Sequence, residues 1–79
     1  MTPRTALAPV EVDSTLLACV SYHDAQLLLD LEFRDGAIYR YSAVPAATYH
    51  DLLAAESKGS FFNQSIRNRF RYTRLRPAR

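Results

Sequence analysis

The sequence predicts an α+β domain in which a three- to four-stranded antiparallel meander carries two helices packed on one face. Three observations lead to this fold class. Apolar residues alternate with charged ones over residues 29–34, which is the period-two pattern of a half-buried strand. The pair Asp35-Gly36 follows, and such a pair is a common turn signal between two strands. After Pro45, apolar residues recur at helical spacing instead.

Three extended segments build the predicted meander: residues 15–23, 26–34 and 37–42. The second and third can be joined by a two-residue loop at Asp35-Gly36 or by a three-residue loop that includes Arg34. We favour the longer loop, with glycine in the left-handed position, because it groups aromatic residues with leucines and pairs opposite charges. Its register predicts three cross-strand pairs: Leu31 with Tyr39, Leu29 with Tyr41, and Asp30 with Arg40.

The first predicted helix follows the meander directly. Pro45 suits the first helical position, where its missing N–H costs nothing. Tyr49, Leu52 and Leu53 continue the helical spacing to about residue 55. Residues 57–59 then break the helix.

A second helix is expected to start at Ser60, whose hydroxyl can cap it. Phe62, Ile66 and Phe70 follow at four-residue intervals and predict a buried stripe. Residues 71–75 are expected to form a short final strand or an extended arm.

The 79 residues predict one small domain. We expect residues 1–12 to be a flexible N-terminal lead, residues 13–75 to form the domain, and residues 76–79 to be a basic C-terminal tail. No segment approaches the roughly 18 apolar residues of a membrane span, and the N-terminus lacks the features of a secretory signal. The single cysteine, Cys19, lies in an apolar run, which favours a buried thiol in a reducing compartment. We therefore expect a cytoplasmic protein without membrane contact.

Charge is distributed very unevenly along the chain. Residues 1–56 hold all eight acidic residues and three arginines, whereas residues 57–79 hold seven basic residues and no acid. The first part has a net charge of −5 and the second a net charge of +7. A concentrated basic surface attracts phosphate-bearing polymers, so RNA is the expected partner. Solvated arginines, arginines paired with the acids of the first part, and an acidic protein partner remain alternatives.

The candidate nucleic-acid-binding residues lie in and after the second predicted helix. Ser60, Asn63, Arg67 and Arg71 share one face at helical spacing and would form a phosphate track. Backbone N–H groups at the start of this helix would attract anions. The alternative for Asn63 is local capping of the preceding turn. The full predicted set is Lys58, Gly59, Ser60, Asn63, Arg67, Arg69, Arg71, Arg74 and Arg76.

Tyr39, Arg40 and Tyr41 form a secondary candidate site. Aromatic residues on a sheet hold bases in several RNA-binding modules. The favoured register argues instead that both tyrosines lie on the buried face with their hydroxyls at the rim. It also argues that Arg40 pairs with Asp30 across the strands.

No catalytic or cofactor-binding pattern is present in the sequence. His23 and His50 are each followed by an aspartate, but neither has a nucleophile or metal-ligand spacing beside it, so we expect surface histidines. Asp30 and Glu32 share a strand face and are interpreted as solvated carboxylates. With two glycines in the chain there is no phosphate-binding loop. We expect no enzyme activity, no metal, no cofactor and no small-molecule substrate.

Taken together, these stretches resemble the KTSC domain family, a small bacterial domain named after the C-terminal domain of some lysyl-tRNA synthetases. The similarity covers roughly residues 13–75. The matching motifs are Tyr22, residues 29–33 with Gly36, the triplet Tyr39-Arg40-Tyr41, Val44-Pro45, residues 57–63, Ile66-Arg67 and Tyr72. Members often have a glycine before the first tyrosine, where this chain has Ser21, so the local strand geometry is expected to differ there.

The resemblance supplies no catalytic residue, and the synthetase fusion implies RNA binding only as a suggestion. We therefore expect a non-catalytic RNA-binding accessory domain, with tRNA or another structured RNA bound largely by electrostatics through the C-terminal arginines. The alternative is a protein–protein interaction module that uses an open sheet edge or docks acidic and basic surfaces together.

Overall fold

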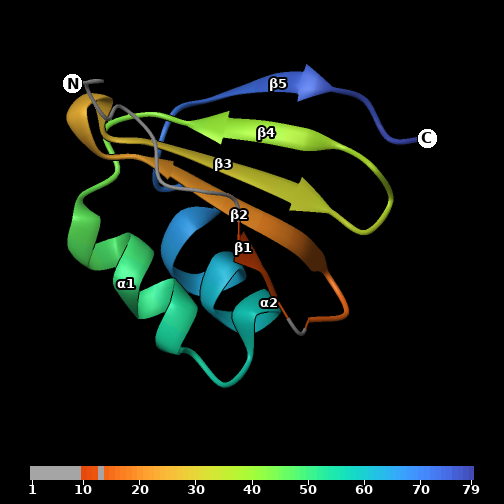
Figure 1. The fold of residues 1–79 in the computed structure, drawn as a ribbon, viewed down its shortest axis with the longest axis horizontal. Helices are drawn as coiled ribbons and strands as arrows, with labels where there is room; N and C mark the ends of the chain where they lie inside the picture. Colours follow the sequence, from red (N-terminus) through yellow and green to blue (C-terminus); the bar gives the residue numbers. More distant parts are fainter. Residues whose placement is uncertain (1–9, 13) are drawn as a thin grey trace, which may run out of the picture.

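The computed structural model describes residues 10–12 and 14–79 and shows one five-stranded antiparallel sheet with its helices on one side (Figure 1). The strands are ordered β1-β2-β3-β4-β5, so each pairs with its neighbour in the sequence. Their bounds are Val10–Glu11 for β1, Leu17–His23 for β2, Leu28–Phe33 for β3, Ile38–Tyr41 for β4 and Tyr72–Arg76 for β5. The predicted α+β meander is confirmed, with five strands instead of three or four.

The helical layer lies between β4 and β5 in the sequence. Helix α1 spans Ala46–Ala54, and α2 spans Lys58–Phe61 and continues into a π-helical segment, η2, over Phe62–Ile66. A short 3-10 turn, η1, spans Asp24–Gln26 between β2 and β3. No helix in the described part of the chain is long and apolar enough to cross a membrane.

The hairpin between β3 and β4 has the predicted three-residue-loop register. Leu31 pairs with Tyr39, Leu29 with Tyr41, and Asp30 with Arg40. Gly36 has a φ of 96°, which favours glycine, and its N–H donates to Phe33 O at 2.9 Å. Local turn chemistry therefore determines which β4 residues face the helices.

Both ends of the domain are more ordered than the sequence predicts. At the N-terminal end, Val10 and Glu11 pair with β2, and Val12 is buried, so these residues do not belong to a flexible lead. The remainder of the predicted lead, residues 1–9, lies outside the described residues. At the C-terminal end, β5 extends through Arg76, and Arg79 N donates to Asp35 O at 2.8 Å. Backbone pairing of this kind satisfies polar groups that a free tail would leave to water.

The second helix starts three residues earlier than predicted, at a different serine. Ser57, not Ser60, is the N-cap, and its hydroxyl accepts a hydrogen bond from Ser60 N at 3.2 Å. Pro45 likewise occupies the N-cap of α1 instead of its first helical position.

The second helix also ends early, with Arg67 N donating to Phe62 O at 2.8 Å in a π-type turn. Asn68 then adopts a left-handed conformation, with a φ of 63°. Phe62 and Ile66 are buried as predicted, but Phe70 lies beyond the helix and is only partly buried. The predicted helical stripe is therefore broken before Arg71.

The core lies between the sheet and the helices. Leu17, Val20, Leu29 and Leu31 of the sheet have no exposed surface. Tyr22 is also buried, stacks on Tyr49 of α1 at 4.9 Å between ring centroids, and donates its hydroxyl hydrogen to Val44 O at 2.6 Å. A buried hydroxyl with a partner avoids the cost of desolvation.

The prediction that Cys19 is buried is wrong. Its side chain is half-buried on the outer face of the sheet. The β2–β3 register shifts between Leu17 and Cys19, so Ala18 is an extra residue in β2. Such a bulge changes which face the following side chains take. Burial together with the Glu32 and Glu11 charges raises the pKa of the Cys19 thiol, which keeps it protonated.

Candidate nucleic-acid interface

A groove of about 560 Å³ lies where β4 and β5 extend beyond the helical layer. Its floor is the inner face of the sheet, and its side wall is the end of η2. The lining residues come from β4 and β5, from the turn after β3, and from residues 62–68, together with Leu16, Phe33 and Ala78. This volume falls within the range of about 300–1,000 Å³ that is common for ligand sites.

Three tyrosines form the aromatic part of this groove. Tyr72 lies 5.3 Å from Tyr39 and 5.7 Å from Tyr41, measured between ring centroids. Tyr41 is buried and Tyr39 half-buried, whereas 59% of Tyr72 is exposed. Burial raises the pKa of Tyr41 to about 12, the hydroxyls of Tyr39 and Tyr72 add to the rise, and Arg67 opposes it. The three tyrosines and Arg67 line the same groove.

Polar side chains from the end of η2 form the opposite wall. Asn63 is the second residue of η2, Arg67 is the residue that follows it, and Asn68 comes next in its left-handed conformation. Within residues 10–12 and 14–79, neither asparagine side chain has a hydrogen-bond partner. The capping role considered for Asn63 belongs to Ser57 instead.

A bulge in β5 separates its two arginines. Tyr39 pairs with Arg74 and Ile38 pairs with Arg76, so Leu75 is an extra residue in β5. Arg74 consequently lines the groove, whereas Arg76 turns to the outer face. There Arg76 donates to Gly36 O at 2.8 Å and to Glu32 Oε2 at 3.2 Å. Arg76 therefore lies outside the groove and is paired with a carboxylate.

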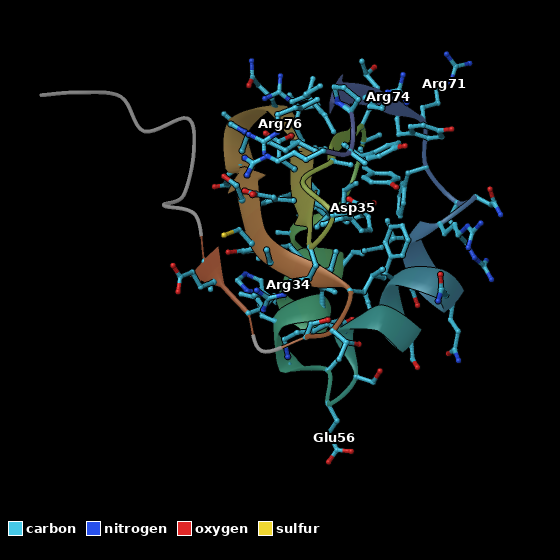
Figure 2. All side chains as sticks on the ribbon, turned by 90° about the vertical axis from the view of Figure 1, so that its right-hand side faces the viewer. Arg34, Asp35, Glu56, Arg71, Arg74 and Arg76 are labelled. Carbon is cyan, nitrogen blue, oxygen red and sulfur yellow. The ribbon has the colours of Figure 1, made fainter. Side chains whose placement is uncertain are left out.

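We define the basic rim as Arg67, Arg69, Arg71 and Arg74, four exposed residues along and beside the groove. Among the described residues, none of the four lies within ion-pair distance of a carboxylate. Arg69 donates to Gln64 O at 3.2 Å, a contact that leaves its charge unneutralised. Figure 2 shows Arg71 and Arg74 at one end of the molecule and Glu56 at the other.

The predicted anion site at the start of the second helix is not part of this surface. Lys58 Nζ donates to Ala55 O at 2.7 Å, the carbonyl that follows α1. Gly59 lies against Leu16, at 3.5 Å from the position of an added Cβ. Neither these two residues nor Ser60 lines the groove, and α2 lies on the side of the molecule away from β5 (Figure 1). Lys58 thus stabilises the connection between α1 and α2.

Arg40, the remaining secondary candidate, lies on the outer face of the sheet in the predicted pair with Asp30. Its Nε and Nη2 donate to the two carboxylate oxygens of Asp30 at 2.8 and 2.9 Å. His23 Nε2 lies 2.9 Å from the same carboxylate, so His23 is a half-buried partner of Asp30 and not a free surface histidine. Burial raises the pKa of the Asp30 carboxyl, but the hydrogen bonds from Arg40 and His23 outweigh it and leave the pKa lowered. This network stabilises the β2–β3–β4 pairing.

The side chains that line the groove are suited to binding a ligand. Within the described ranges, no three His, Cys, Asp or Glu side chains are grouped to hold a metal ion. Asp35 is the acidic residue in the lining, and its Oδ1 accepts a hydrogen bond from Ala37 N at 3.0 Å. The arrangement offers aromatic faces, hydroxyl and amide groups, and cations.

Sequence reasoning missed Tyr72 and Asn68 as groove residues. Tyr72 pairs directly with Tyr41 in the β4–β5 register. Treating residues 71–75 as a strand paired with β4 would have placed Tyr72 beside the other two tyrosines. Asn68 carried no such signal, because its position follows from the early end of η2.

Comparison with known proteins finds relatives in sequence and in fold. The family model described as the KTSC domain matches residues 13–70. A protein of Tsukamurella paurometabola is 42% identical over 64 residues, which are 81% of this chain and 96% of the relative. A lysine–tRNA ligase of Nostoc punctiforme is 33% identical over 63 residues, which are 80% of this chain and 11% of the ligase.

The crystal structure of a KTSC domain protein from Yersinia pestis superposes with a TM-score of 0.83 at 28% identity. The match covers 86% of this chain and 96% of that one, so it includes the sheet and the helical layer together. The family model, the relatives and the solved structure agree over most of the chain, and the chain therefore belongs to the KTSC domain family.

Proposed function

We propose that this chain is a non-catalytic RNA-binding accessory domain of the bacterial cytoplasm, and that the basic rim contacts the RNA backbone. The observation that carries the proposal is that four exposed arginines, two lining the groove and two lining the adjoining surface, have no carboxylate partner among the described residues. Exposed cations of this kind release counterions when they contact phosphates, which favours binding.

The relatives add a second line of support. Part of a lysine–tRNA ligase is similar to this chain, and that enzyme is named for a tRNA substrate. A domain that adds RNA affinity would serve such an enzyme without any chemistry of its own. Tertiary structure in the RNA would let the rim contact several phosphates at once.

The salt dependence of binding tests this proposal. Four rim contacts to single-stranded RNA give a log–log slope of about −3, at about −0.7 per contact, so an approximately fourfold rise in salt weakens binding about fiftyfold. Fluorescence anisotropy with bulk bacterial RNA fragments measures this slope directly. A flat salt response, or no binding at low salt, would contradict the proposal.

Arg71→Gln and Arg34→Gln make a matched pair for this test because each removes one positive charge. Arg71 belongs to the rim, whereas Arg34 lies away from it and donates to Val12 O and Ser14 O (Figure 2). Arg71→Gln should reduce the slope by about 0.7, and Arg34→Gln should leave it unchanged. Equal effects of the two substitutions would show that net charge, and not the rim, determines affinity.

The open edge of β5 favours a second candidate function. Within the described chain no strand pairs with the outer side of β5, and four of its five residues are exposed. Such an edge can accept a strand from a protein partner or from a second copy. A salt-insensitive homodimer in size-exclusion chromatography, without RNA affinity, would favour this function over RNA binding.

A further inference from the structure

We propose that the groove between β4–β5 and the end of η2 holds one unpaired nucleobase of the bound RNA, stacked on Tyr72, with an adjoining phosphate on Arg67 and Arg74. The inference rests on the proposed function and adds the form of RNA that the domain selects. It predicts a preference for single strands, loops or ends over continuous duplex.

Tyr72 is built as a stacking platform. Its residue is 59% exposed, yet its ring contacts Tyr39 and Tyr41, which are fixed in β4. An exposed aromatic ring that is already held in place loses little side-chain freedom when a ligand covers it. Every base has an aromatic face, so stacking on such a ring gives affinity without demanding a particular sequence.

The polar groups around this platform match the edges of a base. Asn63 and Asn68 each provide an amide donor and acceptor, and the tyrosine hydroxyls provide both as well. Within the described structure these hydroxyls and amides have no intramolecular partner, in contrast to the buried Tyr22 hydroxyl, which donates to Val44 O. A base edge therefore meets groups that are free to bond it.

The charges in the groove favour a phosphate beside the base. Arg67 directly follows η2 and Arg74 lies in β5, so cationic residues from two different elements line the same space. The acidic lining residue, Asp35, accepts a hydrogen bond from Ala37 N and keeps its negative charge, so the two arginines leave the lining with a net positive charge. A free carboxylate ligand would use the arginines but not the aromatic platform, whereas a nucleotide uses both.

Duplex RNA cannot make this interaction. Its bases are stacked on one another, and only their edges reach the grooves of the helix. The space of about 560 Å³ suits one extruded nucleotide and not a double helix. Duplex is therefore left with the electrostatic contacts of the basic rim.

The test compares three short RNAs with equal numbers of phosphates: a single strand, the same strand with abasic sites, and a duplex of matched charge. Anisotropy should show that the single strand binds most tightly. Tyr72→Ala should weaken its binding roughly five- to hundredfold with an unchanged salt slope, whereas Tyr72→Phe should retain it. The abasic strand and the duplex should bind both forms of the protein equally.

Thr73→Ala is the matched control because Thr73 is the next residue of β5 and pairs with Arg40 on the outer face. It should leave binding of all three RNAs unchanged. Tyr72→Leu retains apolar contact with Tyr39 and Tyr41 but lacks an aromatic face, so it should weaken single-strand binding as Tyr72→Ala does.

The outcomes separate this inference from the proposed function. If all three RNAs bind with the expected salt slope but equally well, and Tyr72→Ala and Tyr72→Leu bind like the parent protein, the base-stacking site is wrong and the basic rim stands. If none of the RNAs binds at low salt, both proposals are wrong.

Discussion

The inner face of the sheet has two halves with different surroundings, although both are made of large side chains at inward-facing positions. In the β2–β3 half, Leu29 and Leu31 are fully buried beneath the helices, and Tyr22 bonds Val44 O. In the β4–β5 half, the same face carries Tyr39, half-buried, and Tyr72, 59% exposed. Leu31 and Tyr39 are direct cross-strand partners, so the change occurs between adjacent residues.

The difference shows that facing inward and being buried are separate properties. Strand alternation determines the face of the sheet on which a side chain lies. Whether that face is covered depends on how far the helical layer extends, which is set by where the helices begin and end. A large aromatic residue beyond the helical layer has contacts on one side only, and its other side is available to a ligand.

Truncation of one side chain in each half gives the largest expected contrast. Leu31→Ala should lower the free energy of unfolding by about 2–5 kcal/mol, because it leaves a cavity in a fully buried site. Tyr72→Ala should lower it by less than about 1 kcal/mol, the range of a cross-strand contact. Urea denaturation followed by circular dichroism measures both. Similar losses would show that Tyr72 belongs to the core.

Removal of one hydroxyl in each half gives a smaller contrast with less disturbance of packing. Tyr22→Phe should cost about 1–3 kcal/mol of stability, because it leaves the buried Val44 carbonyl without its partner. Tyr39→Phe should cost less than about 0.5 kcal/mol, since Tyr39 lines the groove and its hydroxyl has no hydrogen-bond partner among the described residues. Thermal unfolding of the two variants under one buffer condition provides the comparison. A large cost for Tyr39→Phe would place its hydroxyl inside the folded core.

Local sequence rules correctly predicted how β3 pairs with β4. Alternation over residues 29–34 and the Asp35-Gly36 turn were sufficient to give the β3–β4 register, including the Asp30–Arg40 pair. Both signals act over a few neighbouring residues, so they can be evaluated without knowledge of the rest of the chain. The same rules predicted that Tyr39 and Tyr41 are both core residues, which is correct for Tyr41, whereas Tyr39 is only half-buried.

The candidate site was harder to predict because it depends on deviations from regular structure. The extra residue Leu75 turns Arg76 to the outer face, and the π-type turn after Phe62 ends the helix before Arg67. Neither deviation can be recognised from the spacing of apolar residues in the sequence, which is the pattern used to predict helices and strands. As a result, Arg67 and Arg74 were predicted as members of one long basic series, whereas they line one groove from two different elements.

Tyr41 lies at the boundary between the two halves, and its titration makes the stability depend on pH only in alkaline solution. Burial raises its pKa to about 12, with a further contribution from Tyr39 and Tyr72, whereas an unfolded tyrosine titrates near pH 10. The folded state therefore favours the neutral phenol, and this stabilisation is complete below about pH 10 and is lost as the pH rises through about 12. Urea midpoints measured across this range should fall more steeply for the parent protein than for Tyr41→Phe. Equal slopes would mean that Tyr41 titrates like an unfolded tyrosine and that water already reaches its hydroxyl from the groove.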